Sequence, residues 1–270
     1  MENKIMQDIK SLPPLSSTIT KLQSVSIERD TSIKEVADIV QEDPFLSANI
    51  IKSANSPIYG FPHKITSISQ AVSMFGISTI KGLAISSAIR SSFEIDLAPY
   101  KLDIEQFIRT SLMKSKFMLL WYKNDVQKLD ILIPTSLLMH MGMVIISEYV
   151  KKNGKAEEFK NSIDEDNFLN KELQIIGITQ YEILELLFKH WNFDSIMIES
   201  IHLLYSNEAL NSADQYVYPL RVLNTIITPY KIATQKQITD CIELIEKYQL
   251  DMGMFNEALT RIQNMDLENA

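Results

Sequence analysis

The chain has 270 residues, of which 46% are hydrophobic and 22% charged, and its formal net charge is −8. This balance is typical of soluble globular proteins and excludes a disordered or fibrous chain. Because proteins that neutralise DNA phosphates usually present a basic face, the acidic charge disfavours nucleic acid as the main ligand.

The few turn-forming residues bear on the fold class, and the single cysteine bears on the cellular compartment. Seven glycines and nine prolines are too few for the many tight turns of a β-rich fold, so we expect long helices. Because Cys241 is the single cysteine, the chain cannot form an internal disulfide, and this fits a reducing cytosol. The N-terminus lacks the apolar core of a signal peptide, and the uncharged stretch 131–147 is shorter than the roughly 20 residues of a membrane helix. We therefore predict a cytoplasmic protein without membrane insertion.

The first hundred residues predict a bundle of five helices. Their apolar residues recur at helical spacing over residues 15–26, 33–41, 44–54, 68–75 and 79–92. Ser32, Asp43 before Pro44, and Ser67 are residue types that begin helices, because a side-chain oxygen accepts a free N–H of the first turn. Gly76 is placed to end a helix in a left-handed conformation.

Longer helices are predicted in the second part of the chain. A connector covers residues 93–103, and the predicted helices cover 104–122, 134–152, 166–176, 180–191, 195–206, 215–228, 237–249 and 254–265. Thr179 with Glu182 matches a capping box at the start of one of them. The predicted fold is all-α, with an N-terminal bundle (1–100) packed against a larger helical domain (101–270).

A set of short motifs runs through the first part of the chain. In order they are Leu12-Pro13-Pro14-Leu15, Ser32-Ile33-Lys34-Glu35-Val36-Ala37, Asp43-Pro44-Phe45-Leu46, Ala54-Asn55-Ser56, Ile65-Thr66-Ser67-Ile68-Ser69-Gln70-Ala71-Val72 and Phe75-Gly76. Their order and spacing closely resemble the HDOD domain, a module of bacterial signalling proteins related to the HD phosphohydrolases. The resemblance covers roughly residues 8–205, and it implies that the second domain is a degenerate HD-like domain.

Eight motif residues are candidate structural or interaction residues. They are Pro13, Pro14, Asp43, Pro44, Asn55, Ser56, Gln70 and Gly76. The prolines fix backbone φ, and the aspartate, asparagine and serine side chains can hydrogen-bond free backbone groups at helix ends. We interpret them first as residues that specify the fold, with direct contact to a partner as the alternative.

The same resemblance implies where a metal site would lie. HD hydrolases hold one or two metal ions with histidines and aspartates on neighbouring helices, and the metal activates a water for attack on phosphate. Matching those sequence contexts to this chain places the ligand positions at Thr110, Met139, His140, Gln180, His202 and Asn224. Only two of these residues are histidines, and none is a carboxylate.

This set of residues argues against metal catalysis. Hard cations such as Mg²⁺ or Mn²⁺ need mostly oxygen ligands with negative charge, and zinc usually needs three or four ligands. Neutral threonine, methionine, glutamine and asparagine side chains cannot offset the charge of a buried cation. We therefore predict no catalytic residue, no bound metal, no cofactor and no enzyme activity.

Two further features leave alternatives open. His140 lies in an apolar segment, where it is either an ordinary core histidine or a remnant that still binds a ligand or senses pH. Residues 67–89 superficially resemble a DNA-reading helix-turn-helix, but the second helix offers only Lys81 and the following Arg90 as contacts. We interpret this segment as a core helix hairpin.

The prediction for function is a regulatory or signal-transduction protein whose partners are other signalling proteins. A partner or a small ligand such as a nucleotide would shift the packing of the two helical parts. The first alternative is a phosphohydrolase of the cyclic-dinucleotide type with an atypical site around His140 and His202. The second is a nucleotide sensor that binds without hydrolysis, and a transcriptional regulator ranks third.

Overall fold

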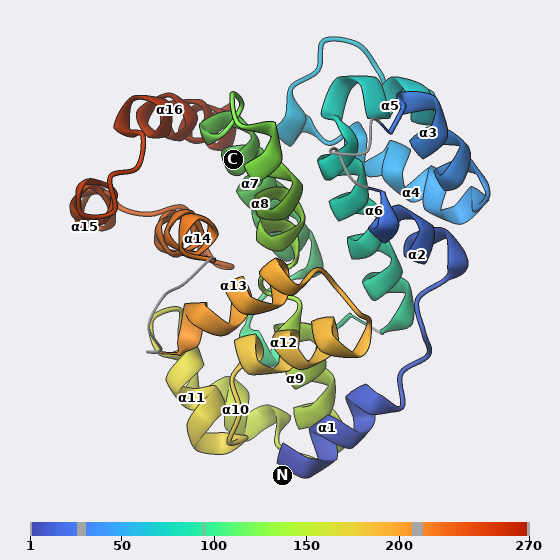
Figure 1. Ribbon diagram of the computed structural model, residues 1–270. Coiled ribbons are helices and arrows are strands. Elements are labelled where there is room, and N and C mark those ends of the chain that lie inside the picture. Colours follow the sequence, from blue (N-terminus) through green and yellow to red (C-terminus); the bar gives the residue numbers. More distant parts are fainter. Residues whose placement is uncertain (1, 26–30, 94, 207–212, 269–270) are drawn as a thin grey trace.

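The computed structural model describes residues 2–25, 31–93, 95–206 and 213–268, and helices account for most of them. Within this part of the chain there is no β-sheet, only an isolated antiparallel bridge between Ile227 and Ile232. Figure 1 shows the early helices on one side, α7 and α8 in the middle, and the later helices below and on the other side. The prediction of an all-α fold is confirmed.

Five helices of the N-terminal part lie close to their predicted ranges. They are α2 (Ser17–Ser24), α3 (Ile33–Gln41), α4 (Pro44–Ala54), α5 (Ile68–Phe75) and α6 (Ile77–Ser92), with a short 3₁₀ helix, η2 (Pro57–Tyr59), after α4. Asp43 Oδ1 begins α4 by accepting the backbone N–H groups of Phe45 and Leu46, both at 3.0 Å. Gly76 separates α5 from α6 at φ 78°, a conformation that a residue with a Cβ rarely adopts.

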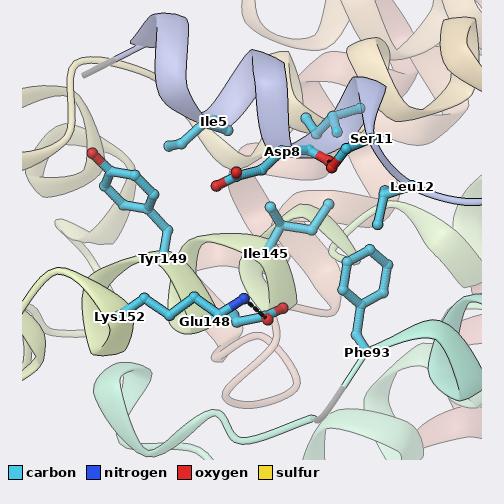
Figure 2. A pocket seen from close by; sticks show the side chains of 10 residues that line it. Ile5, Asp8, Ser11, Leu12, Phe93, Ile145, Glu148, Tyr149 and Lys152 are labelled. Carbon is cyan, nitrogen blue, oxygen red and sulfur yellow. Dashed lines mark hydrogen bonds and ion pairs between the residues drawn. The ribbon is translucent and has the colours of Figure 1, made fainter.

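An unpredicted helix, α1 (Glu2–Lys10), precedes this bundle. Ile5 and Ile9 of α1 are buried, because α1 packs against α12 and lies over α9 (Figures 1 and 2). The chain then returns to the bundle past Pro13, whose carbonyl oxygen accepts the indole N–H of Trp191 at 3.0 Å. The first residues of the chain therefore stabilise its second half.

The second part of the chain begins with the 3₁₀ helix η3 (Ala98–Tyr100). The helices that follow are α7 (Ile104–Trp121), α8 (Val126–Leu138), α9 (Gly142–Lys152), α10 (Ala156–Ser162), α11 (Phe168–Ile175), α12 (Gln180–His190), α13 (Ser195–Tyr205), α14 (Asp214–Ile226), α15 (Gln235–Lys247) and α16 (Met252–Glu268). The short α10 was not predicted. Thr179 forms the predicted capping box with Glu182 at the start of α12.

The predicted helix over residues 134–152 is wrong, because the chain breaks at residues 139–141. Asp125 caps α8 eight residues before the expected start, and Pro134 lies inside that helix. A Cβ on Gly142 would lie 2.0 Å from the carbonyl oxygen of Gln180, so only glycine allows this approach. The break brings the start of α9 against the start of α12, which is a long-range contact that a local pattern does not reveal.

One continuous cluster of buried side chains runs through both parts of the chain. Helix α6 of the bundle packs along α8, where a Cβ on Gly82 would lie only 3.2 Å from Pro134 Cα. The described stretch 126–152 is apolar enough to span a membrane by composition, but 94% of its most apolar window is buried inside the fold. It is therefore the central core of the molecule. The boundary between residues 100 and 101 stays a prediction, because the core continues across it.

Candidate functional site

Three of the six predicted ligand positions lie together in the structure. His140 lies in the turn between α8 and α9, Gln180 begins α12, and Asn224 belongs to α14. The side-chain nitrogen Nε2 of Gln180 lies 3.0 Å from Nδ1 of His140, and Asn224 lies beside the His140 ring. Tyr181, which sequence reasoning did not single out, lies with its ring 5.9 Å from that of His140.

A buried lysine also belongs to this site. Lys114 lies on α7, one turn after Thr110, and is 1% exposed, and its ammonium nitrogen has no hydrogen-bond partner. It is close enough to His140 to lower the pKa of that histidine. We call Lys114, His140, Gln180, Tyr181 and Asn224 the His140 cluster.

Sequence reasoning missed Lys114, although a signal was present. On a helix, residues three, four and seven positions apart share one face, and Lys114 follows Phe107 by seven positions and Thr110 by four. It therefore lies on the stripe that continues with Phe117 and Trp121, both buried. A charged residue inside such a stripe is rare unless it has a function or a partner.

Burial controls the protonation of both basic groups in the cluster. Burial lowers the pKa of Lys114 well below its ordinary value, and no carboxylate contributes to oppose this effect. Burial, together with the nearby Lys114, holds the pKa of His140 well below its ordinary value, although Asn224 partly raises it. His140 is therefore uncharged near neutral pH, so a pH-sensing role for it is not supported.

Four buried polar atoms of the cluster form no hydrogen bond of normal geometry, although Asn224 lies close enough to His140 and Tyr181 to shift the pKa of both. The four atoms are Nζ of Lys114, Nε2 of His140, Oε1 of Gln180 and the hydroxyl oxygen of Tyr181. Each such atom costs about 1–3 kcal/mol relative to a bonded one. Such a group of unsatisfied atoms at one place marks a polar site inside an otherwise apolar core.

The cluster does not fit a catalytic metal. Its side chains are one imidazole, neutral amides, a phenol and the buried amine of Lys114. None of them supplies negative charge, whereas metal sites in proteins are lined by carboxylates or histidines. Among the residues that the structure describes, no group of three or more histidine, cysteine, aspartate or glutamate side chains could hold a metal ion.

The nearest buried carboxylate serves another network. Glu172 of α11 is fully buried, and the hydroxyl of Tyr100 donates to its Oε1 at 2.7 Å. The backbone N–H of Gln180 donates to its Oε2, also at 2.7 Å. Burial raises the pKa of Glu172 to about 8. Both oxygens are therefore occupied by the start of α12 and by η3, and neither is directed to His140.

The remaining predicted positions do not extend the cluster. Thr110 donates within its own helix to the carbonyl oxygens of Gln106 and Phe107, both at 3.1 Å. Met139 is fully buried core. His202 lies away from the cluster, where its Nδ1 lies 2.9 Å from Oε2 of Glu185.

The family-motif residues described above occupy structural positions. The side-chain nitrogen of Asn55 donates to the carbonyl oxygens of Ile51 and Ile65, each at 2.8 Å, and its oxygen accepts the N–H of Ile65 at 2.9 Å. Gln70 accepts the N–H of Thr66 at 3.0 Å. These contacts give the residues a structural role, and a role in contacting a partner stays a prediction.

Two depressions of the surface differ in how their charges are balanced. The first is a cleft of about 200 Å³ under α1, where Lys152 already pairs with Glu148 and also faces Asp8 (Figure 2). The second is a groove of about 690 Å³ between the N-terminal bundle and α7, and it contains Lys52 and Arg90. Of the two, only the groove contains cations without a paired carboxylate among the described residues.

Comparisons with known proteins match this architecture. The family model of the HDOD domain matches residues 12–206. Among solved structures, the chain is similar to a virulence factor from Campylobacter jejuni, with 26% identity over 100% of both chains and a TM-score of 0.62. No curated protein matches the sequence.

Two further solved structures share the fold at lower identity. One is described as a candidate phosphohydrolase from Shewanella amazonensis, with 19% identity over 98% of both chains and a TM-score of 0.67. The other is described as a candidate signal transduction protein from Marinobacter aquaeolei, with 18% identity and a TM-score of 0.65, over 97% of this chain and 60% of that one.

Proposed function

The chain belongs to the HDOD domain family, and from this premise we propose that it is a regulatory protein of bacterial signalling that works by binding rather than by catalysis. It acts in the cytoplasm, and its partners are other signalling proteins or a small ligand. Binding favours one packing of the N-terminal bundle on the HD-like helices and so changes what the surface presents.

The observation that carries this proposal is the composition of the His140 cluster. A hydrolytic HD site depends on a metal that lowers the pKa of a bound water and polarises the phosphate. The cluster instead contains a buried lysine and neutral side chains, and its four unpartnered polar atoms belong to Lys114, His140, Gln180 and Tyr181. These residues supply no negative charge to seat such a metal.

The packing of the core supports coupling between the two parts. Helix α6 of the bundle packs along α8, and α8 ends at the turn that contains His140. A ligand that moves α6 therefore acts directly on α8, which leads into the turn that contains His140. Such coupling requires that the ligand binds one packing more tightly than the other.

The competing function is hydrolysis of a phosphate ester. The purified full chain is assayed for bound metal by elemental mass spectrometry and for hydrolysis of bis(p-nitrophenyl) phosphate and of a cyclic dinucleotide with added Mn²⁺, Fe²⁺ or Ni²⁺. We expect substoichiometric metal and no turnover, and no change in either result for His140→Ala. Stoichiometric metal together with turnover, both lost in His140→Ala, would overturn the proposal.

A further inference from the structure

The largest of the grooves described above lies between two helices of the bundle and the first helix of the HD-like part. Its volume is about 690 Å³, and its walls come from α4 and α6 on one side and from α7 with the preceding connector on the other. Small-molecule sites in proteins usually enclose about 300–1,000 Å³. The groove is therefore large enough for a ligand such as a nucleotide.

The charge of the groove is opposite to that of the whole molecule. The chain carries a net charge of −8, yet the groove contains Lys52 and Arg90, and none of the described residues that line it is acidic. Neither cation forms an ion pair with a described carboxylate. The groove is thus a place where an otherwise acidic protein attracts an anion.

Arg90 is the main source of positive charge in the groove. It lines the groove and also a smaller adjoining pocket of about 20 Å³. Its Nε is buried without a hydrogen-bond partner, and burial lowers the pKa of its guanidinium. A planar guanidinium with free donors is suited to bind a phosphate through two parallel hydrogen bonds.

Interaction with the end of α6 does not by itself explain why the Arg90 side chain is partly buried. Cations in the last turn of a helix often interact favourably with its free carbonyl groups, and Arg90 lies in the last turn of α6. An exposed side chain would serve that purpose. Arg90 instead is partly buried with an unpartnered Nε, and it lines the groove, where an anion can contact the guanidinium.

The hydroxyl of Ser87, one turn before Arg90 on α6, is available to donate a hydrogen bond. The side-chain nitrogen of Asn49 donates to the Ser87 hydroxyl oxygen at 2.9 Å, and both residues line the groove. Because that oxygen accepts from Asn49, the hydroxyl proton of Ser87 is directed elsewhere. It can donate to the same anion as Arg90.

The opposite wall of the groove is apolar. Ile104, Ile108 and Leu112 lie on one face of α7, and Ile104 is 42% exposed. An apolar side chain of this size exposed beside a cationic wall fits a ligand with one charged end and one flat apolar part. Inorganic phosphate alone would leave this wall uncovered.

We propose that the groove between α4, α6 and α7 binds a nucleotide, with Arg90, Lys52 and Ser87 on the phosphate and with Ile104, Ile108 and Leu112 against the base. This inference rests on the proposed function, because it names the class of the regulatory ligand. It does not depend on the His140 cluster, so the metal assay and the nucleotide assay fail independently.

The inner end of the groove connects to the centre of the molecule. The small pocket beside Arg90 is closed by Leu137 at the end of α8 and by Met141, the residue after His140. A nucleotide in the groove therefore contacts the bundle through α6 and the HD-like part through α7, and it lies one residue layer from the turn that joins α8 to α9. This position is suited to a ligand that changes how the two parts pack.

The test is binding of AMP, ADP, GMP and GDP to the full chain by isothermal titration calorimetry at physiological salt. We expect at least one nucleotide to bind at a stoichiometry of one, and adenosine, guanosine and inorganic phosphate to bind far more weakly. Arg90→Gln should weaken binding by about tenfold or more, since a charge-assisted hydrogen bond is lost. Ile104→Ser should weaken it by about threefold, since apolar contact is lost at an exposed position.

A matched control separates local recognition from net charge. Lys34→Gln changes the charge by the same amount on an exposed face of α3, and it should bind the nucleotide as the parent does. Thermal unfolding without ligand shows whether Arg90→Gln is folded, and only its ligand-dependent shift in Tm should disappear. Binding by none of the four nucleotides, equal binding of inorganic phosphate, or equal loss in Lys34→Gln would each overturn the proposal.

Discussion

Two buried polar networks meet at the first residue of α12, and they differ in how completely they are satisfied. The backbone N–H of Gln180 donates to Glu172, whose other oxygen accepts from Tyr100. The side chain of Gln180 contacts His140, in a cluster where four polar atoms have no partner. The two networks have similar burial but opposite hydrogen-bond balance.

This difference in hydrogen bonding distinguishes a network with a structural role from one without such a role. A buried carboxylate with both oxygens bonded ties α11, η3 and α12 together and so specifies the fold. A buried lysine with no partner lowers the stability of the fold and connects no helices. We interpret the Glu172 network as part of what holds the domain together, whereas the His140 cluster has no such structural role.

The largest expected effect is loss of the Glu172 side chain. Glu172→Ala should lower the free energy of unfolding by about 3–4 kcal/mol, because it leaves the Tyr100 hydroxyl and the Gln180 N–H unbonded and creates a cavity. Chemical denaturation at pH 6 measures this difference. Tyr100→Phe serves as a control and should cost less, since it removes one hydrogen bond and leaves the carboxyl group bonded to Gln180. A loss below about 1 kcal/mol for Glu172→Ala would contradict the structural role.

The second prediction concerns the pH dependence that Glu172 imposes. Its pKa is about 8 in the folded chain and near the ordinary 4.5 when unfolded, so the folded state binds more protons between these values. Stability from this group is therefore present in full well below pH 4.5 and is lost as the pH rises through 8, by on the order of 3 kcal/mol between pH 5 and pH 8. Glu172→Gln, which mimics the protonated acid, should remove that loss. Parallel denaturation curves of parent and variant from pH 5 to pH 8.5 would argue against it.

The third and smallest effect is a gain of stability. Lys114→Met should raise the free energy of unfolding by about 2 kcal/mol at pH 7, because it removes an unpaired buried amine and keeps an apolar chain of similar length. The pKa of Lys114 is lowered in the folded chain, so the unfolded state binds more protons and the parent gains stability as the pH rises toward 10. The advantage of Lys114→Met should therefore shrink between pH 7 and pH 10, as measured by urea denaturation. Destabilisation at pH 7 would indicate that Lys114 has a bound partner.

Much of the local structure was predictable, because helix ends depend on residues a few positions apart. Asp43, Ser67 and Thr179 cap helices as predicted, and Gly76 ends α5 at a positive φ of 78°, although its ψ of 166° lies outside the predicted left-handed helical conformation. The break inside residues 134–152 was not predictable, because it depends on Gly142 approaching Gln180 from a distant segment. The unpredicted α1 is stabilised by its contacts with α12 and α9, and the spacing of its buried Ile5 and Ile9, four positions apart, was a signal that sequence reasoning missed.

The candidate site was predictable in part. The resemblance placed His140, Gln180 and Asn224 at the former metal site, and the structure brings these three together. It also suggested His202, which instead pairs with Glu185. Lys114 lies four positions after Thr110 and is the residue that most changes the chemistry of the cluster. Its importance follows from its burial, which the sequence alone does not show.

By itself, the sequence determined the helical class, most helix ends and the family resemblance, and from that resemblance it predicted that most metal-ligand positions hold other side chains. Only the tertiary structure decided that Lys114 is buried without a partner, that Glu172 is fully bonded, and that Lys52 and Arg90 line the same groove. The physical reason is the range of the interactions. A capping hydrogen bond forms within one turn of chain, whereas desolvation and the pairing of charges depend on which distant helices pack together.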